Sequence, residues 1–322
     1  MSQKHTLPVP LLARSFTTAE ARELGVPPSR LRAHDLAHPF HGVHSLTSHV
    51  GPTAAEGVDP LLDSVAGYQA RMAPDEFFSH STAARLLGMP LPRAFEGDRM
   101  LHVAVVAPAH PPQSRHVRGH RLSTARVIRL SGKRVSDPVS TWCQLATQLP
   151  VDDLVAVGDF IVTGPDPLKG APALATLEDL SRTSLAATRR PGARRLRQAL
   201  PLVRIGAYSR KETQLRLLFV GCGLPEPALN HPVVCRDGVE RLLDLAYPHL
   251  RLGFEYEGDW HRTDRRKFRS DITRHEHFAD VDWDRMRVTE DDLATAASRA
   301  TLELRIRHRI ANRTEYVART AA

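Results

Sequence analysis

The segment from Leu252 to His261 gathers side chains that could do chemistry into a short length of chain. Its sequence, LGFEYEGDWH, places three carboxylates and a histidine within seven residues, directly after an apolar run. Carboxylates repel one another unless a cation compensates, so their crowding predicts that a cation binds there. Hard oxygen ligands suit Mg²⁺ or Mn²⁺, and a divalent ion held by two acids is a common means of hydrolysing a phosphodiester.

The strands around this segment determine which acids can meet. Residues 241–258 divide into two strands around Pro248-His249, and a turn that pairs Tyr247 with Leu250 would sort the side chains by face. One face would carry the apolar side chains Leu243, Leu245, Leu252, Phe254 and Tyr256, and the other the acids Asp244, Glu255 and Glu257. Asp244 and Glu255 then become diagonal neighbours that can reach one ion. The alternative is an exposed acidic face that pairs with neighbouring arginines.

Residues before and after the two strands supply further candidates. Upstream, Ser209 and Glu212 have the spacing of a capping box, which explains Glu212 without chemistry, although its carboxylate could reach a metal through water. Downstream, His261 directly follows the second strand.

A helix expected from about residue 265 to 279 would place Lys267, Asp271 and Arg274 on one face, where they could stand over a phosphate. The alternating segment DRMRVT, residues 284–289, then closes the sheet as a further strand.

This order of elements resembles the PD-(D/E)XK nuclease superfamily. The order is a helix with Glu, a strand with Asp, a strand with Glu, a helix with Asp-x-x-Arg and a final strand. More closely, residues 207–293 are similar to the endonuclease-like domain related to very-short-patch-repair enzymes, through the motifs LLDLAYP, FEYEGDWH and DITRHEHF. The resemblance implies that Asp244 and Glu255 are metal ligands, Glu212 is an accessory acid, and His261 is a general acid or base.

One position departs from the superfamily pattern. The lysine expected two residues after the strand acid is replaced by Glu257. Lys267, Arg274 or His261 would have to substitute for it, or Glu257 would be a further ligand. A degenerate site that binds DNA without cutting it remains the other alternative.

The first part of the chain has the pattern of a winged helix. Thr17 or Thr18 caps a helix that Gly25 closes, and Ser29 caps a second helix that runs through Leu31 and Leu36. The segment FHGVHSL, residues 40–46, alternates like a small β-wing. The order of elements favours this fold over an ordinary helical hairpin, and the second helix would carry Arg30 and Arg32 towards a DNA groove.

Residues 60–163 predict a small α/β domain. SHSTAARLLGMPLP, residues 79–92, indicates a helix that ends at Gly88, and LHVAVVAP, residues 101–108, indicates a buried strand. Two more helices are separated by Pro150. His80 is expected to cap or pack rather than to catalyse. These motifs, together with TTAEARELGV and FHGVHSL, resemble the amino-terminal half of actinobacterial proteins related to AbiEi-type antitoxins and transcriptional regulators over residues 10–165.

Composition supports a polyanionic partner. The 322-residue chain has a net charge of +8 and a sequence pI near 9.8, and residues 189–211 contain eight Arg or Lys and no acid. Arginine-rich chains are also common in GC-rich bacterial proteomes, so the charge alone does not identify DNA. Three widely spaced cysteines and the absence of a signal peptide or an eighteen-residue apolar run predict a cytoplasmic protein outside the membrane.

We therefore expect an α/β (α+β) chain with four parts: a winged-helix module over 10–50, an AbiEi-like domain over 60–163, a basic linker or helical segment over 164–206, and a restriction-endonuclease-like mixed sheet flanked by helices over 207–310. The first functional hypothesis is a Mg²⁺- or Mn²⁺-dependent DNA endonuclease. The second is a non-catalytic regulator or antitoxin-like protein, for which a homodimer or a toxin would be partners. A glycosidase is disfavoured, because aromatic content is only 6%.

Overall fold

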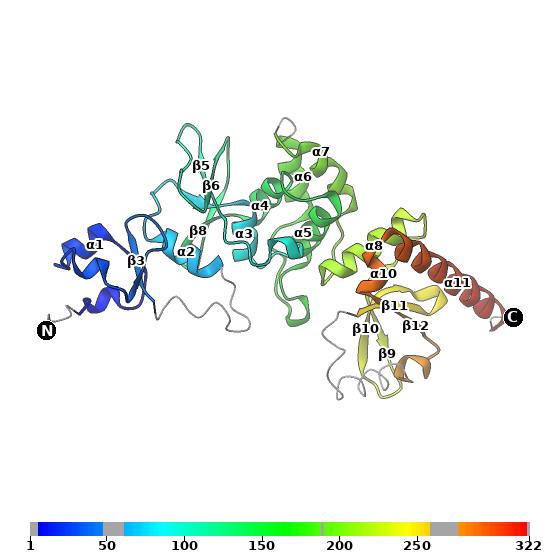
Figure 1. Cartoon of the computed structure of the whole chain (residues 1–322). Helices are drawn as coiled ribbons and strands as arrows, with labels where there is room; N and C mark the ends of the chain where they lie inside the picture. Colours follow the sequence, from blue (N-terminus) through cyan, green and yellow to red (C-terminus); the bar gives the residue numbers. More distant parts are fainter. Residues whose placement is uncertain (1–5, 48–60, 188–189, 258–275, 321–322) are drawn as a thin grey trace. The chain divides into compact units, whose positions relative to one another are not determined.

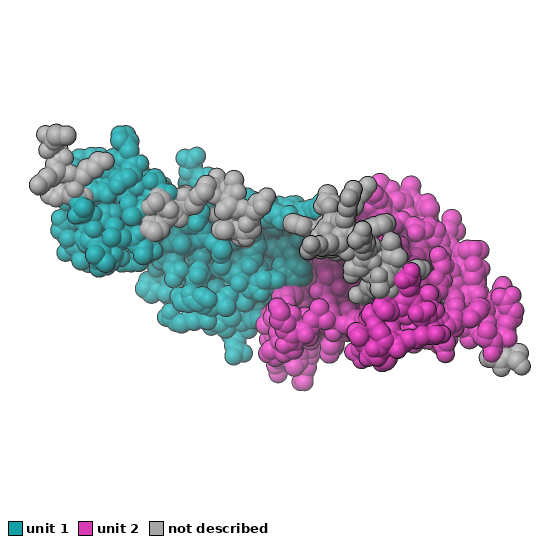
Figure 2. Space-filling model, turned by 90° about the horizontal axis from the view of Figure 1, so that it is seen from below, with its two compact units in different colours: residues 1–148, 190–192 teal, residues 149–189, 193–322 magenta. Residues whose placement is uncertain are grey.

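The computed structural model describes residues 6–47, 61–187, 190–257 and 276–320. The described residues form an α+β structure with sheets of three, four and five strands. The chain divides into two compact units, shown in Figure 2: unit 1 contains residues 1–148 and 190–192, and unit 2 contains residues 149–189 and 193–322. Of the helices in the described ranges, none carries an apolar stretch of the length that a bilayer crossing requires.

Unit 1 begins with a small sheet of order β1-β3-β2. Thr17 starts the helix beside it, because its Oγ1 accepts a hydrogen bond from Glu20 N at 3.1 Å while the Glu20 carboxylate accepts one from Thr17 N at 2.7 Å. This capping box confirms Thr17 as the predicted cap. The elements are η1 (Val9–Leu11), β1 (Phe16–Thr17), α1 (Thr18–Glu23), η2 (Arg30–Arg32), β2 (Leu36–Ala37) and β3 (Val43–Leu46).

The second helix of this region is shorter than predicted. Ser29 makes no side-chain cap, the helical part is the single 3₁₀ turn η2, and Leu36 lies in β2 instead of the helix. Leu31 and Leu36 are both buried in one apolar cluster, so their burial is satisfied by a turn followed by a strand. The helical spacing of these two leucines was therefore a poor guide to local structure.

The remainder of unit 1 is built on a five-stranded sheet of order β6-β5-β4-β8-β7, in which β5 and β6 are parallel. The predicted helix at residues 79–88 and the predicted strand after residue 100 are both confirmed. The elements are α2 (Leu61–Gln69), β4 (Phe77–Phe78), α3 (His80–Leu86), η3 (Arg93–Phe95), β5 (Leu101–Val106), β6 (Val117–Leu122), β7 (Val127–Leu130), β8 (Lys133–Ser136) and α4 (Pro138–Leu145).

Unit 2 begins with helices that precede its sheet. Residues 164–206, expected as a basic linker or helical segment, contain two α-helices whose residues Leu180 and Leu196 are fully buried. The segment therefore belongs to the interior of unit 2 as well as to its surface. The elements are α5 (Val151–Thr163), η4 (Pro167–Lys169), α6 (Leu177–Ala186), α7 (Ala193–Ala199) and η5 (Leu200–Leu202).

The four-stranded sheet of unit 2 has the order β12-β11-β10-β9, with β11 and β12 parallel and the other pairs antiparallel. Figure 1 shows α8, α10 and α11 along one side of this sheet. The elements are α8 (Arg210–Gly221), β9 (Ala228–Val234), β10 (Glu240–Tyr247), η6 (Pro248–Leu250), β11 (Leu252–Glu257), β12 (Asp284–Thr289), α10 (Glu290–Ala294) and α11 (Ala296–Thr320).

The register of the β10–β11 hairpin differs from the predicted one. Tyr247 pairs with Leu252 instead of Leu250. The chain between them makes the 3₁₀ turn η6, and Arg251 takes a left-handed conformation with φ 47°. The chain therefore reverses two residues later than predicted. Leu250 is thereby released from the ladder and is buried in the core beneath the sheet.

The apolar side chains of the hairpin do not all share one face. Leu245, Leu252 and Phe254 lie in one cluster, as predicted for a shared face, and this cluster includes residues of α8 and α11, with partly buried Tyr256 packed against it. Leu243 instead joins the separate cluster of Val233, Cys235, Ala246 and Phe278. On the neighbouring strand β9, Asn230 lies between the residues that pair with Leu243 and Leu245, and its φ is 44°. This left-handed residue interrupts the regular alternation of side chains between the two faces of the sheet.

Candidate functional site

Asp244 and Glu255 lie on adjacent strands of the unit 2 sheet. Leu245 pairs with Phe254, and Asp244 and Glu255 are the next residues of the two strands beyond this last paired rung. Asp244 Oδ2 accepts a hydrogen bond from Tyr256 N at 2.8 Å. The hairpin therefore places the two predicted ligands on adjacent strands, next to the same paired rung, and fixes the orientation of Asp244.

Arginines of β12 contact the acids of β11. The Arg285 guanidinium forms an ion pair with the Glu255 carboxylate, and their side chains are only 2% and 9% exposed. The half-buried Glu257 pairs with Arg287 at 2.9 Å. These contacts follow from the parallel pairing of β11 with β12, which places alternating arginines beside alternating glutamates. The arrangement fits the alternative in which neighbouring arginines balance the acidic face.

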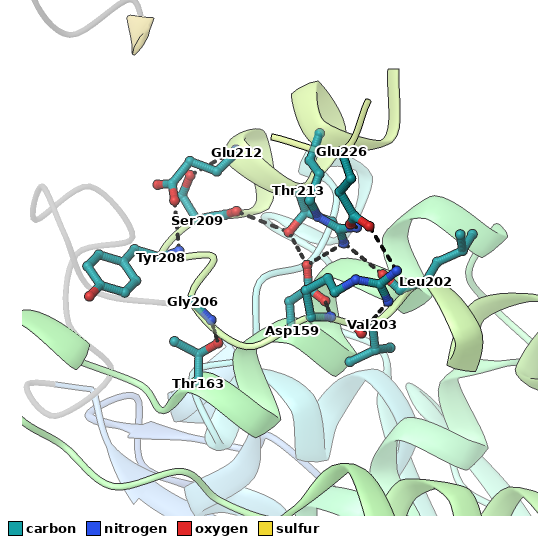
Figure 3. Close-up of polar contacts among 12 residues, drawn as sticks. Asp159, Thr163, Leu202, Val203, Gly206, Tyr208, Ser209, Glu212, Thr213 and Glu226 are labelled. Atoms are coloured by element: carbon teal, nitrogen blue, oxygen red, sulfur yellow. Dashed lines mark hydrogen bonds and ion pairs between the residues drawn. The ribbon is translucent and has the colours of Figure 1, made fainter. Parts of the chain in front are cut away.

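Glu212 is buried near the start of α8 (Figure 3). Ser209 Oγ accepts from Glu212 N at 3.1 Å, as predicted for a helix cap. The Glu212 carboxylate does not complete a capping box with Ser209 N, because its Oε2 accepts from Tyr208 N at 2.8 Å and from Asn230 Nδ2 at 2.7 Å. Burial raises the pKa of Glu212 and these hydrogen bonds lower it, with burial the larger effect.

Asn230 connects Glu212 to the hairpin, and sequence reasoning missed it. It lies between Leu229 and His231, the partners of Leu245 and Leu243, and so stands across the ladder from Asp244. Its side-chain amide also donates to Gly206 O at 2.7 Å. An asparagine followed by His-Pro in a strand is the one local signal, because asparagine tolerates the left-handed conformation better than most residues.

Lys211 is a second residue that the sequence analysis did not single out. Its ammonium pairs with Glu290 and lies 5.5 Å from the centre of the Tyr256 ring, while the Tyr256 hydroxyl donates to the same carboxylate. This places a lysine from α8 beside β11, the strand that carries Glu255 and Glu257.

A buried charge network holds α8 in place (Figure 3). Arg216 is fully buried and donates to Asp159 Oδ2 at 3.0 Å and to Glu226 Oε1 at 2.8 Å. Asp159 also accepts from Thr213 Oγ1 at 2.8 Å and from Arg204 N at 2.7 Å. Burial raises the pKa of Asp159, and Arg216 opposes that rise. The network fixes the helix that presents Glu212.

Several predicted site residues lie outside the described residues. These are His261, Lys267, Asp271 and Arg274, together with residues 265–275 of the helix expected over about 265–279. The structure therefore bears on Glu212, Asp244, Glu255 and Glu257 alone among the residues proposed for catalysis.

The predicted DNA-contacting arginines of unit 1 differ in their surroundings. Arg30 makes a two-pronged contact with Asp35, with both nitrogen–oxygen distances 2.8 Å, and its side chain is 11% exposed. Arg32 is exposed on the same turn. Arg32 is therefore the better placed of the two to contact a partner.

One group of metal-ligating side chains converges within the described ranges. It comprises His80, His102 and His120 of unit 1, whose ligand atoms all lie within 4.8 Å of one another. In the same described residues, Glu212, Asp244, Glu255 and Glu257 do not form a comparable group of three. His80 packs, as expected, but the sequence analysis did not connect it with His102 or His120.

Comparisons with known proteins identify two relatives, but no family, for this chain. No family model matches the chain, and no solved structure matches it. Two curated relatives from Mycobacterium tuberculosis, the uncharacterized proteins MT2308 of strain CDC 1551 / Oshkosh and Rv2248 of strain ATCC 25618 / H37Rv, are 28% identical over 175 residues. The match covers 54% of this chain and 61% of each relative, so the chain spans less than two thirds of their length.

Proposed function

We propose that unit 2 is a metal-dependent nuclease domain that hydrolyses phosphodiester bonds in DNA. The observation that carries this proposal is the placement of Asp244 and Glu255 on the adjacent strands β10 and β11, each next to the paired rung of Leu245 and Phe254. Two carboxylates in adjacent strands can share one divalent cation, and their mutual repulsion would favour its binding.

The order of elements in unit 2 supports the same proposal. A helix with Glu212 precedes three antiparallel strands, and the fourth strand runs parallel to the third. The helix with Glu, the strand with Asp, the strand with Glu and the closing strand are elements expected from the resemblance to the PD-(D/E)XK superfamily, whereas β9 is additional and the helix with Asp271 and Arg274 lies outside the described residues. We therefore propose a restriction-endonuclease-like architecture for unit 2, within the α+β fold class that the structure shows.

The donor set fits Mg²⁺ or Mn²⁺, because both groups offer carboxylate oxygens and the Asp244 carboxylate is oriented by Tyr256 N. Asp244 and Glu255 would hold the ion, which would activate water and neutralise charge on the scissile phosphate. Glu212, with its raised pKa, would act as an accessory acid from α8. Arg285 would exchange its contact with Glu255 for one with the phosphate, and Lys267, Arg274 and His261 remain candidates to assist.

We further propose that the first part of unit 1 is a winged-helix-like module that binds DNA. The sheet order β1-β3-β2, the capped helix α1 and the β2–β3 hairpin support this, with the second helix reduced to η2. The exposed side chain of Arg32 and the net charge of +8 suit contact with phosphates.

The second candidate function is a non-catalytic DNA-binding regulator or antitoxin-like protein. The buried ion pair between Glu255 and Arg285 favours it, because an arginine then supplies the compensating charge that a metal would otherwise supply. Glu257, where the superfamily has lysine, favours it as well. In this case the sheet of unit 2 would serve packing or partner binding.

A nicking assay separates the two functions. Purified full-length protein is incubated with supercoiled plasmid in Mg²⁺, Mn²⁺ or EDTA, beside Asp244→Asn, Glu255→Gln and the control Glu240→Gln, which alters an exposed acid at the start of β10. The nuclease proposal predicts metal-dependent nicking that is lost in the first two variants and retained in the control. Binding to DNA without nicking in any metal supports the regulator instead.

A further inference from the structure

Three histidines of unit 1 come together from separate elements. His80 is the first residue of α3, His102 lies in β5 and His120 in β6. In the parallel β5–β6 ladder, His120 pairs with Ala104 and is thus one side-chain step from His102 on the same face. The fold therefore directs three imidazoles to one point at the junction of a helix start and two strands.

The spacing of the imidazole nitrogens is in the range of a metal site. His102 Nδ1 and His120 Nε2 are 2.9 Å apart, and the ligand atoms of all three residues lie within 4.8 Å of one another. Nitrogens bound tetrahedrally to Zn²⁺ at about 2.0–2.1 Å are separated by roughly 3.3 Å, which lies between these limits.

The three rings are neutral. Burial, the largest cause in each case, lowers the pKa of His80 to about 2 and the pKa values of His102 and His120 to about 4. Neighbouring histidines and the exposed Arg118 add to the effect. Each neutral ring keeps a lone pair on one nitrogen, which is the form that binds metal. A pH switch near neutrality does not fit these values.

Surrounding polar groups hold the histidines in position. Gln144 Oε1 accepts from His80 N at 2.9 Å, and Thr82 Oγ1 accepts from His102 N at 2.8 Å. Ser79 Oγ lies 3.0 Å from His80 Nδ1. Ser79 Oγ is thus the partner of the His80 Nδ1 atom, which leaves the Nε2 atom as the ring nitrogen for a metal. Such supporting hydrogen bonds are typical of metal-binding histidines.

Gln148 lies against the His102 ring with an amide oxygen that has no hydrogen-bond partner among the described residues. Its Nε2 lies 3.3 Å and 3.4 Å from the two ring nitrogens of His102, while its Oε1 is buried. Exchanging the amide oxygen and nitrogen by a half-turn puts the oxygen against the ring, where it can accept a proton from one His102 nitrogen. The other His102 nitrogen then presents its lone pair to a metal.

We propose that His80, His102 and His120 form a binding site for a divalent transition metal of the Zn²⁺ class, independent of the carboxylate site in unit 2. Imidazole is a ligand that suits Zn²⁺ and disfavours Mg²⁺. The ion ties the start of α3 to β5 and β6, and its fourth position is open to water through the partly exposed side of His120. The His120 ring stacks on His80, with centroids 3.8 Å apart and an interplanar angle of 23°, and on His102 at 16°, so binding turns the rings about their Cβ–Cγ bonds.

The test titrates ZnCl₂, and separately CoCl₂, into chelator-treated full-length protein by calorimetry and visible absorption. The proposal predicts one tight site per chain that MgCl₂ does not fill, lost in His120→Gln and retained in His110→Gln, a control at an exposed histidine of the same unit. Gln148→Leu should weaken zinc binding by about 10- to 100-fold, as expected for a supporting residue.

X-ray absorption of the zinc-loaded wild-type protein keeps the test decisive if a histidine variant fails to fold. The proposal predicts nitrogen or oxygen ligands at about 2.0–2.1 Å and no sulfur at about 2.3 Å, which excludes the three free cysteines. Absence of stoichiometric zinc uptake, binding unchanged in His120→Gln, or sulfur in the first shell would overturn it. None of these results affects the proposed nuclease, whose test uses Mg²⁺ and acid variants.

Discussion

Replacing Arg216 with methionine should destabilise unit 2 strongly, and in a pH-dependent way. The side chains of Arg216 and Asp159 are 0% and 1% exposed, so the substitution leaves a carboxylate buried without its cation. Thr213 Oγ1 and Arg204 N remain as its donors. Breaking a buried pair from one side typically costs about 3–5 kcal/mol.

Protonation of Asp159 limits this cost. Keeping a proton on a carboxyl whose ordinary pKa is 3.8 costs about 4 kcal/mol at pH 7 and about 2 kcal/mol at pH 5. Loss of Arg216 raises the folded-state pKa of Asp159 further, so stability is retained below the unfolded pKa and lost as pH rises towards the folded pKa. We expect Arg216→Met to lower stability by about 3–4 kcal/mol at pH 7 and by about 2 kcal/mol at pH 5.

Hydrogen exchange by mass spectrometry can measure this effect for peptides of α8, because it reports local opening free energies in a chain with two units. Adding Asp159→Asn to Arg216→Met should recover most of the loss at pH 7. Arg182→Met, which removes an exposed pair on α6, is the control and should leave exchange in α8 unchanged. A loss below about 1 kcal/mol at pH 7, or an equal loss at both pH values, would refute the reasoning.

Further substitutions test the hairpin, the site and the DNA contact. Gly253→Ala should destabilise unit 2 by about 1–3 kcal/mol in urea unfolding, because its Cβ would lie 2.5 Å from Leu243 Cδ1, and Leu243→Ala should relieve part of that cost. Asn230→Ala should reduce metal-dependent nicking, since it removes a 2.7 Å hydrogen bond to the accessory acid of α8; unchanged nicking would exclude that role. Arg285→Met should tighten Mn²⁺ binding in calorimetry by removing the cation that competes for the site. Arg32→Ala should weaken DNA binding and reduce the salt dependence by about one unit of slope, whereas an unchanged slope would place the DNA elsewhere.

Local sequence signals predicted α8, β10, β11 and β12 of unit 2 and α1, α3 and β5 of unit 1, but not β9 or α11. The Thr17 and Ser209 caps were confirmed, because each depends on residues a few positions apart. The alternation of the hairpin strands holds for Leu245, Leu252 and Phe254 but fails at Leu243. The prediction of a second helix in unit 1 was wrong, because a turn followed by a strand buries the two leucines as well as a helix would. The hairpin register was wrong because Arg251, a residue without glycine's freedom, adopts a left-handed turn.

The surroundings of the candidate site depend on contacts between distant parts of the chain. Arg285 meets Glu255 only because β12 runs parallel to β11, which no local pattern announces. The histidine cluster likewise requires the parallel pairing of β5 with β6 and the packing of α3. Residue types therefore indicated the candidate acids, while their arginine partners and the histidine cluster depend on tertiary structure.

The central claim is that Asp244 and Glu255 together hold one divalent cation. Its most direct measurement is a calorimetric titration of full-length protein with Mn²⁺ in the presence of short duplex DNA, repeated for Asp244→Asn, Glu255→Gln and His120→Gln. The proposal predicts one bound Mn²⁺ per chain that is lost in both acid variants and retained in the histidine variant. No Mn²⁺ uptake by the wild-type protein with DNA present, or uptake that both acid variants keep, would contradict it.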